Sequence, residues 1–465
     1  MGTQGLPRVT EIHHDPQLFV DDFLVDNRWA DNHRAESVRR VFHQPAKHPA
    51  NPVIAGDGGY VNVVRDDEAG LFRMWYQAYW DISYEPRKYT YAVAYAESPD
   101  GIHWKLPRIR RHSFKNTLDN NIVFAGPFGD HASCQFIVDA PEEDRRGYRY
   151  VMLHGTRSAE GHGMHLIGSH DGIEWDPASS SLIFPGYRPD THSSILWDPR
   201  LRTYVCFTRA TNLYDDTNGL RRRVARLESP NLWDTWPIYP ENVLIPDELD
   251  ERSGHPLFYG MPTQYYAGIY WGFLWPYAYG GDIHTELAFS RDGWNFQRLP
   301  ERPRLVDRGP EGSWDAGMVF ASTWLEVGDE WWLYYSGTDG GHNSRENVPG
   351  IGLARVRKEG FVSLRSPAGG GTVVTKLMRW PGGRLLVNAD ASKSEFTVLA
   401  TGYDRKPIDG FDPAPSLPVT GDRVRHEVVW AHGDIRALEG KPIRLEFLMR
   451  GEVDLFGFQA VPEEA

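Results

Sequence analysis

The pattern of apolar and polar positions predicts short β-strands through most of the chain. Segments such as LFRMWYQAY, YAVAYAES and GMHLIGS are rich in aromatic and β-branched residues and end in Gly, Asp, Ser or Pro. Such runs are typical of buried or half-buried strands bounded by tight turns. The sequence therefore predicts an all-β fold.

A turn sequence recurs after four of these strands. SPDGIHW, SHDGIEW and SRDGWNF begin at Ser98, Ser169 and Ser290, and a divergent copy, SPNLWDTW, begins at Ser229. In each repeat, an aromatic-rich strand precedes the strand that ends in the turn. A third, more continuously apolar strand precedes the aromatic-rich one. A fifth copy, GIGLARVRKEG from Gly350, keeps the strand without the turn. The repeat length is about 60–70 residues, which is the signature of a repeat architecture.

Three strands and a variable fourth in each repeat predict the blade of a β-propeller. We expect a five-bladed β-propeller over residues 51–362, with residues 1–50 packing on it or closing it. Residues 363–465 contain alternating strands such as RLLVNADA without the recurrent turn. They predict a C-terminal β-sandwich, with an elaborated closing blade as the alternative.

The recurrent turn has a structural interpretation in this fold. It follows the third strand of each blade, so it lies at one end of the propeller, where Asp and Gly suit the turn and Trp packs between blades. The beginnings of the inner strands and the loops between second and third strands converge at the opposite end. We expect the functional residues there.

Charge and hydropathy exclude some functions. Asp and Glu (63) outnumber Lys and Arg (50), giving a net charge of −13, which argues against nucleic acid as a partner. No run of about 18 apolar residues predicts a membrane span. The segment MGTQGLPRVTEIHHDPQ has no basic start followed by an apolar stretch, so we expect a cytoplasmic protein. A secreted protein whose leader has been removed would give the same sequence.

FVDDFLVD followed by HQPAKHPANPV, the five repeats and the terminal sandwich together resemble the five-bladed-propeller glycoside hydrolases. The chain is most similar to the family-32-like and family-43-like members, which include invertase, levanase and arabinofuranosidase relatives. The resemblance implies a glycosidase. The family-32 motifs NDPNG, RDP and EC are replaced by GYVNVVRDD, THSSILWDP and YGMPTQYY, so the catalytic residues of that family are not carried over.

The beginnings of the inner strands carry recurrent Asp and His residues, in GDHASCQF, PDTHSSIL and GSWDAGMV. Glycoside hydrolysis needs two carboxyl groups beside the scissile bond, and a histidine can transfer protons near neutral pH. Asp before a strand is also a common turn residue. The candidate catalytic residues are Asp190 and Asp315 as the carboxylate pair, with Asp130, His131 and His192 beside them.

Aromatic side chains beside Asp, His and Arg suit a sugar, because its C–H faces stack while its hydroxyls form hydrogen bonds. Packing between blades is the other explanation for the aromatic residues. The candidate substrate-binding residues are Asn62, Tyr259, Trp80, Trp275, Tyr277, Asp282, Trp314, Asp339, His342, Arg223 and Glu248. No HExxH or CxxC spacing occurs among them, so we expect neither a metal nor another cofactor.

Three functions fit this set of residues. The leading hypothesis is a hydrolase that cleaves a terminal sugar from a glycan or small glycoside. The alternatives are a polysaccharide lyase, in which His and Tyr move the proton and arginines such as Arg209 and Arg223 neutralise a uronate, and a propeller that binds carbohydrate without catalysis.

Overall fold

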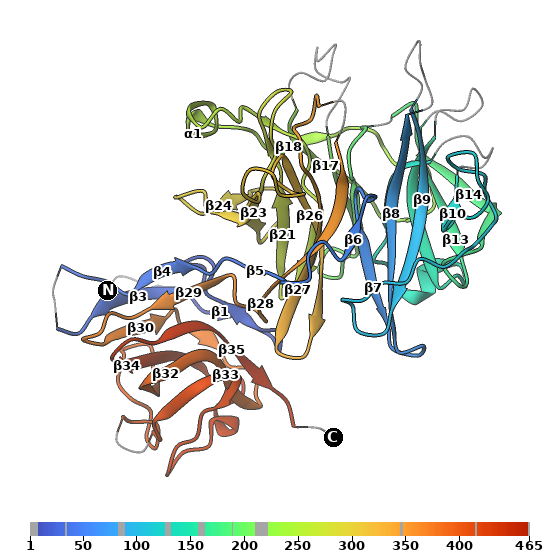
Figure 1. The fold of residues 1–465 in the computed structure, drawn as a ribbon. Coiled ribbons are helices and arrows are strands. Elements are labelled where there is room, and N and C mark those ends of the chain that lie inside the picture. Colours follow the sequence, from blue (N-terminus) through green and yellow to red (C-terminus); the bar gives the residue numbers. More distant parts are fainter. Residues whose placement is uncertain are drawn as a thin grey trace. The chain divides into compact units, whose positions relative to one another are not determined.

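The computed structural model describes residues 8–32, 35–81, 89–125, 132–156, 163–187, 189–209, 222–344, 347–413 and 416–463. Within these residues the regular structure is almost entirely strand, and the one α-helix is α1 (Glu248–Arg252) (Figure 1). No helix in the described part of the chain has the length and apolar character needed to cross a membrane. The predicted all-β fold is confirmed.

The chain forms two compact units. One comprises residues 45–325 and 332–355, and the other comprises residues 1–44, 326–331 and 356–465. Five antiparallel sheets of four or five strands follow one another along the chain in the first unit, which confirms the five-bladed propeller. A further two-stranded sheet joins β19 (Leu257–Phe258) to β22 (Pro276–Tyr277).

Each blade takes its strands in chain order from the innermost outward. Blade one contains β7 (Asn62–Asp66), β8 (Leu71–Asp81), β9 (Tyr89–Ser98) and β10 (Ile122–Phe124). Blade two contains β11 (Ser133–Ile137), β12 (Tyr150–Thr156), β13 (Gly163–Ser169) and β14 (Trp175–Pro185). Blade three contains β15 (Ser194–Asp198), β16 (Thr203–Thr208), β17 (Val224–Ser229) and β18 (Glu241–Leu244). Blade four contains β20 (Thr263–Tyr266), β21 (Ile269–Leu274), β23 (Thr285–Ser290), β24 (Gln297–Arg298) and β25 (Arg304–Val306).

Blade five closes the ring of blades, because it combines strands from the end of the propeller sequence with strands from its beginning. Its strands β26 (Met318–Val327), β27 (Glu330–Thr338) and β28 (Pro349–Arg357) are completed by β5 (Ala46–Lys47) and β6 (Ile54–Ala55), which both pair with β28. The outer strand of the last blade thus comes from the segment that precedes the first blade. Backbone hydrogen bonds therefore close the ring, and the outer edge of β28 is paired.

The recurrent Ser-x-Asp-Gly turn follows the third strand, as expected. In three copies the serine is buried, and its Oγ accepts a hydrogen bond from the glycine N–H three residues later, at 2.8–2.9 Å. The aspartate Oδ1 accepts hydrogen bonds from the backbone N–H groups of the two residues after the glycine. Each glycine has a φ between +73° and +76°, which L-residues rarely adopt.

These turns also join neighbouring blades. The Trp75 indole of blade one donates to the Gly172 carbonyl of blade two at 2.8 Å, and the Tyr334 hydroxyl of blade five donates to the Gly101 carbonyl of blade one at 2.7 Å. Arg226 of blade three donates to the Asp292 carbonyl of blade four at 3.1 Å. The turn is a structural joint between blades.

Substituting Gly172 by Ala is expected to lower the free energy of unfolding by about 2–4 kcal/mol, measured by denaturant titration. A left-handed L-residue costs about 1 kcal/mol, and overpacking costs about 1–3 kcal/mol more. A Cβ at Gly172 would lie 2.4 Å from Trp75 Cζ2. Gly147→Ala is the matched control, because its φ is +82° but its Cβ would meet no described atom within 4 Å. Equal losses of unfolding free energy in the two variants would contradict the role of this turn as a structural joint between blades.

The other unit is built around the long strand β32 (Arg384–Thr401). Its first half pairs with β33 (Val419–Glu427) and β35 (Asp454–Val461), and its second half pairs with β34 (Pro442–Arg450). Around an irregularity between Ala391 and Glu395 the partner of β32 changes from β35 to β34. The remaining strands are β29 (Val362–Arg365), β30 (Gly371–Thr375), β31 (Met378–Arg379), β1 (Thr10–Glu11), β2 (Gln17–Leu18), β3 (Val25–Ala30) and β4 (Arg39–Phe42).

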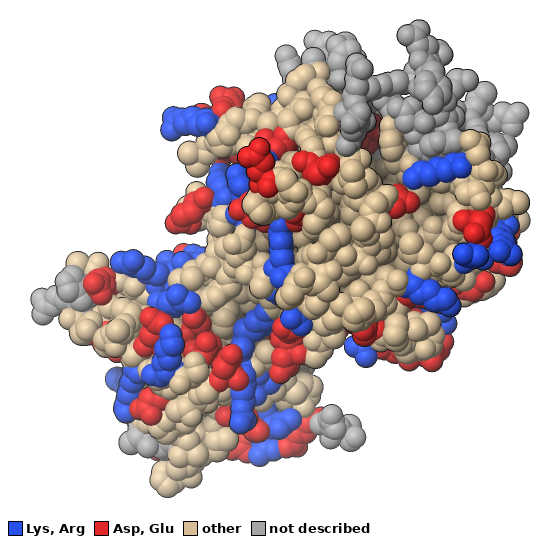
Figure 2. All heavy atoms as spheres, viewed as in Figure 1, with Lys and Arg blue, Asp and Glu red and all other residues tan. Residues whose placement is uncertain are grey.

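Basic side chains lie beside acidic ones over much of the molecular face drawn in Figure 2. The described residues form many exposed ion pairs, such as Arg65 with Asp67 at 2.7 Å and Arg149 with Glu68 at 3.0 Å. Exposed pairs of this kind contribute little to stability, typically about 0–1 kcal/mol each. The charged surface of this face is therefore mixed in sign.

Candidate functional site

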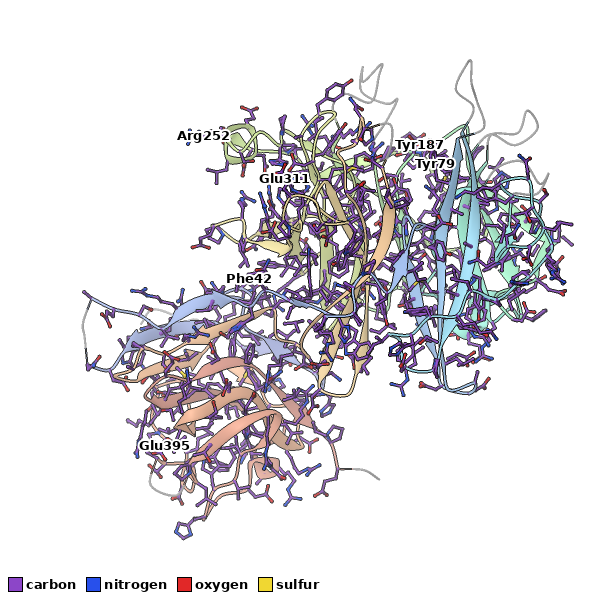
Figure 3. The ribbon with its side chains drawn as sticks, in the orientation of Figure 1. Phe42, Tyr79, Tyr187, Arg252, Glu311 and Glu395 are labelled. Carbon is purple, nitrogen blue, oxygen red and sulfur yellow. The ribbon has the colours of Figure 1, made fainter. Side chains whose placement is uncertain are left out.

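A pocket of about 720 Å³ lies at the end of the propeller opposite the Ser-x-Asp-Gly turns. Residues before the inner strands and residues at the ends of the second strands form its wall, and Tyr79 marks this end of β8 in Figure 3. The lining residues are Asp57, Gly58, Gly59, Tyr60, Gln77, Tyr79, Tyr91, Asp190, Arg222, Tyr259, Met318, Phe320, Ser336, Gly337, Thr338, His342, Asn343, Ser344, Asn347 and Pro349. This is the end at which the topology predicts functional residues.

Two residues of the pocket wall have a left-handed backbone conformation. Tyr60 has a φ of 45° and Asp190 a φ of 50°. Such conformations are strained, above all for a bulky residue, and they concentrate at functional sites. Arg209, which is buried, helps to hold Asp190 in place, because its Nη1 donates to the Asp190 carbonyl at 3.1 Å. The Asp190 side chain is exposed to the pocket.

Asp57 is the second carboxyl group of the pocket and lies in a different environment. Burial raises the pKa of Asp57 above the ordinary aspartate value. The charge of Lys115 and a hydrogen bond from the Gly58 N–H at 3.0 Å oppose this rise without cancelling it. Asp57 therefore keeps its proton to a higher pH than a solvated aspartate does, as a general acid requires.

Tyr259 and His342 form a hydrogen-bonded pair across the pocket, with 3.2 Å between the Tyr259 hydroxyl and His342 Nε2. His342 Nδ1 lies 3.2 Å from Asn343 Oδ1, so Nδ1 carries the proton and Nε2 accepts from the tyrosine. Burial lowers the pKa of His342 and raises that of Tyr259. Near neutral pH both side chains are therefore uncharged.

Two guanidinium groups face the Tyr259 ring. Arg222 Cζ lies 4.7 Å from the ring centroid, and Arg209 Cζ lies 5.0 Å from it. Arg222 also lines the pocket and lies 5.0 Å from the Tyr277 ring. These cation–π contacts place positive charge beside the pocket. The pocket can therefore accommodate an anionic group or a developing negative charge.

Buried aromatic rings support Tyr60 from behind. The Tyr60 ring stacks on His192 with centroids 5.1 Å apart and on Trp275 with centroids 5.8 Å apart. Asn62 Nδ2 lies 3.3 Å from His192 Nε2. Burial lowers the pKa of His192 to about 3, so this ring is neutral. His192, Asn62 and Trp275 support the pocket wall and do not line it.

The structure places the residues predicted from sequence in three groups. Asp190, Tyr259 and His342 line the pocket together. Tyr277 is buried behind them, with its ring centroid 5.3 Å from that of Tyr259. The third group lies away from the pocket lining, and it includes Asp315, the predicted partner of Asp190.

Asp315 is buried and accepts hydrogen bonds from Lys47 at 2.5 Å and from the Tyr335 hydroxyl at 3.1 Å. Trp314 stacks on the Tyr335 ring at 5.6 Å. These contacts give Asp315 a role in holding β5 to blade five, because Lys47 lies on β5. The aspartate accordingly points to a structural partner rather than into the pocket.

The other expected residues are dispersed. Asp282 belongs to a cluster with two histidines, and Arg223 Nη1 donates to the Arg222 carbonyl. The exposed Asp339 accepts a hydrogen bond from the Val348 N–H. The exposed Glu248 is the first residue of α1. Asp130, His131 and the side chain of Trp80 lie outside the described residues.

One important pocket residue, Asp57, was missed. It stands in AGDGGYVNV, a few residues before the inner strand of blade one. Asp190 and Asp130 also shortly precede an inner strand, and this recurrence is the signal that could have identified Asp57. The run Arg221–Arg223 was expected at this end of the propeller, and of its described members Arg222, rather than Arg223, lines the pocket.

No protein-family model matches the chain, and no curated protein matches it. Among the solved structures that are similar to it over most of their own length are the following three. An N-acetylgalactosamine deacetylase from F. plautii has 15% identity and a TM-score of 0.47, covering 69% of this chain and 94% of that one. A β-1,2-mannobiose phosphorylase from Listeria innocua has 12% identity and a TM-score of 0.49, covering 68% and 97%. A glycosyl hydrolase from Bacteroides ovatus has 14% identity and a TM-score of 0.43, covering 67% and 94%.

At these identities and TM-scores, the assignment of the fold depends on the strand pairing itself, and any assignment of function depends on the side chains of the pocket. The resemblance to families 32 and 43 stays a prediction.

Proposed function

We propose that the protein is a glycoside hydrolase that removes a terminal sugar from a glycan or small glycoside in the pocket of the propeller. One observation carries the proposal: the pocket contains two aspartates, Asp57 and Asp190, from different blades and in unlike environments. Carboxyl groups whose surroundings differ in this way can divide the roles of acid and of base or nucleophile.

In this mechanism Asp57 donates its proton to the glycosidic oxygen as the bond to the leaving group breaks. Asp190 either removes a proton from the attacking water or attacks the anomeric carbon itself. In the second case water, deprotonated by Asp57, then displaces Asp190 from the sugar. Tyr79 and Tyr91, with ring centroids 5.6 Å apart, offer aromatic surface to the C–H face of the sugar. Arg222 can donate hydrogen bonds to its hydroxyl groups, and the Tyr259 oxygen, whose proton goes to His342, can accept one.

The proposal is tested by a screen of the purified protein against chromogenic pentofuranosides, fructosides and pyranosides. Release of chromophore together with a new reducing end is expected for at least one sugar. A sugar that binds in the pocket without any product would instead support a carbohydrate-binding propeller, and the absence of both binding and turnover would reject the carbohydrate proposal.

Asp57→Asn is expected to discriminate between leaving groups. The variant should lose about 10²–10⁴-fold in kcat/KM on a substrate with a poor leaving group, since such a substrate needs a proton from the acid. A dinitrophenyl glycoside needs no such proton, so its kcat/KM should stay within about tenfold of wild type. Equal losses on the two substrates would contradict the role of Asp57 as the acid.

The pH profile provides a further test of the same residue. The protonated form of Asp57 is the active one, so the wild-type rate should fall as pH rises through its pKa. Because burial raises this pKa, the fall should occur above the pH at which an ordinary aspartate ionises. On the dinitrophenyl substrate, which needs no proton from the acid, the wild type itself should lack this alkaline limb.

A polysaccharide lyase is the second candidate, and the Tyr259–His342 pair favours it. A neutral histidine can accept a proton and a protonated tyrosine can donate one, while Arg209 and Arg222 can neutralise the carboxylate of a uronate. Elimination forms a conjugated double bond that absorbs in the ultraviolet, whereas hydrolysis does not. An absorbance increase with a uronate polymer would therefore favour the lyase.

A further inference from the structure

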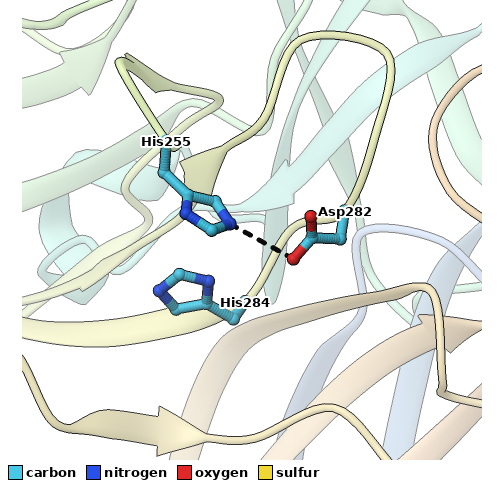
Figure 4. Close-up of side chains that lie close together, drawn as sticks. All are labelled: His255, Asp282 and His284. Carbon is cyan, nitrogen blue, oxygen red and sulfur yellow. Dashed lines mark hydrogen bonds and ion pairs between the residues drawn. The ribbon is translucent and has the colours of Figure 1, made fainter. Parts of the chain in front are cut away.

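A cluster of two histidines and one aspartate lies in blade four, outside the lining of the pocket. His255 precedes β19 (Leu257–Phe258), and Asp282 and His284 lie directly before β23 (Figure 4). One side-chain nitrogen or oxygen from each residue lies within 4.8 Å of the other two. Both histidines are buried, and His284 is only 4% exposed.

The hydrogen bonds around the two imidazoles fix where their protons lie. His255 Nδ1 lies 3.0 Å from the Ser253 carbonyl, which can only accept, so Nδ1 carries a proton and the lone pair of a neutral ring lies on Nε2. Nε2 in turn faces Asp282 Oδ2 at 3.2 Å. A neutral His255 would thus direct a lone pair at a carboxylate oxygen, an arrangement that a cation between them would stabilise.

His284 has the complementary arrangement. Its Nε2 lies 3.0 Å from Glu286 Oε1, so the carboxylate accepts the Nε2 proton and leaves the lone pair on Nδ1. Nδ1 is buried and has no hydrogen-bond partner among the described residues. The His284 ring lies beside the His255 ring, with the two imidazole centroids 4.7 Å apart, and both rings lie near the Asp282 carboxylate. An unpaired buried nitrogen of this kind is costly unless something binds it.

We propose that this cluster is a zinc site, in which His255 Nε2, His284 Nδ1 and the Asp282 carboxylate bind one Zn²⁺ and water completes the coordination. Two imidazoles and a carboxylate suit Zn²⁺. Glu286 and the Ser253 carbonyl orient the two imidazoles from behind, as acceptors commonly do for metal-binding histidines. Arg308 Nη2, 3.1 Å from Asp282 Oδ2, holds the carboxylate from the side.

The ion would stabilise the wall of the pocket. The backbone around Asp282 accepts hydrogen bonds from the loop that carries His342: the His342 N–H donates to the Gly281 carbonyl at 2.8 Å, and the Asn343 N–H donates to the Gly280 carbonyl at 3.2 Å. Fixing Asp282 therefore fixes the position of His342. The role of the ion is structural, and the inference does not depend on which reaction the pocket performs.

The test is metal content and affinity. The purified protein is treated with a chelator, dialysed against Zn²⁺ and then against metal-free buffer, and its zinc is measured by mass spectrometry. Wild type should retain about one zinc per chain, and Co²⁺ in its place should give visible d–d absorption bands. His255→Gln and Asp282→Asn should each bind Zn²⁺ at least about tenfold more weakly. His426→Gln is the matched control, because it removes a buried imidazole of the other unit.

Zn²⁺ should also raise the Tm of wild type and of the control, since a ligand that binds the folded state stabilises it. The two cluster variants should show a smaller rise at the same Zn²⁺ concentration. Asp282 is partly exposed, so Asp282→Asn tests the site even if the His255 variant folds poorly. Substoichiometric zinc in the wild type, or equal retention and equal Tm shifts in wild type and the cluster variants, would overturn the proposal.

Discussion

Replacing Asp190 by Asn is expected to lower kcat by about 10³–10⁴-fold on any glycoside that the wild type cleaves. The amide can neither attack the anomeric carbon nor accept a proton from water, so the variant lacks the second carboxylate of the mechanism. Asn adopts the left-handed conformation as readily as Asp, so the backbone at a φ of 50° need not change. The loss should therefore come from chemistry rather than from misfolding.

Steady-state kinetics on the best substrate measure this effect, with Asp67→Asn as the control. Asp67 is an exposed aspartate of the same unit, in an ion pair with Arg65, and its substitution should leave kcat within about twofold of wild type. Asp190→Gly provides a second test. Glycine accepts the positive φ and leaves space in which azide can replace the carboxylate, so azide should restore part of the turnover.

A kcat for Asp190→Asn within tenfold of wild type would exclude this aspartate from the chemistry. The Tyr259–His342 pair would then be the better candidate for the reacting groups, because it is the other proton-transfer pair described in the pocket. Substitution of His342 by Gln would test that alternative directly.

The architecture could be predicted from sequence because each blade repeats the same local signals. A strand that ends in Ser-x-Asp-Gly is recognisable by itself, and the buried serine and left-handed glycine of that turn explain why its residues recur. The closing strands β5 and β6 carry no such signal. Each has two residues and exists only because β28, far along the chain, presents an unpaired edge.

The candidate site was only partly predictable, for a related reason. Asp190 and Asp315 both stand before an inner strand and look alike in sequence, yet one faces the pocket and the other faces Lys47. The difference arises from a lysine 268 residues away along the chain. Asp57 precedes its strand in the same way, but what distinguishes it is burial, which only the folded environment determines.

Arg298→Met is expected to cause the largest loss of stability, about 3–5 kcal/mol of the free energy of unfolding, because it leaves two buried carboxylates without a positive partner. The Arg298 side chain is 2% exposed. It donates to both oxygens of Asp250, at 2.7 and 2.8 Å, and to Glu286 at 2.5 Å. Met keeps most of the aliphatic volume, so the lost charge dominates the change.

Denaturant titration of Arg298→Met beside Arg65→Met separates a buried from an exposed ion pair. Arg65 pairs with Asp67, whose side chain is 80% exposed, so Arg65→Met should cost less than about 1 kcal/mol. Adding Asp250→Asn to Arg298→Met should recover part of the loss, because one of the two uncompensated charges is then removed. If the two single variants lost equal stability, or if the second substitution only deepened the loss, the buried charges would not be what makes Arg298 necessary.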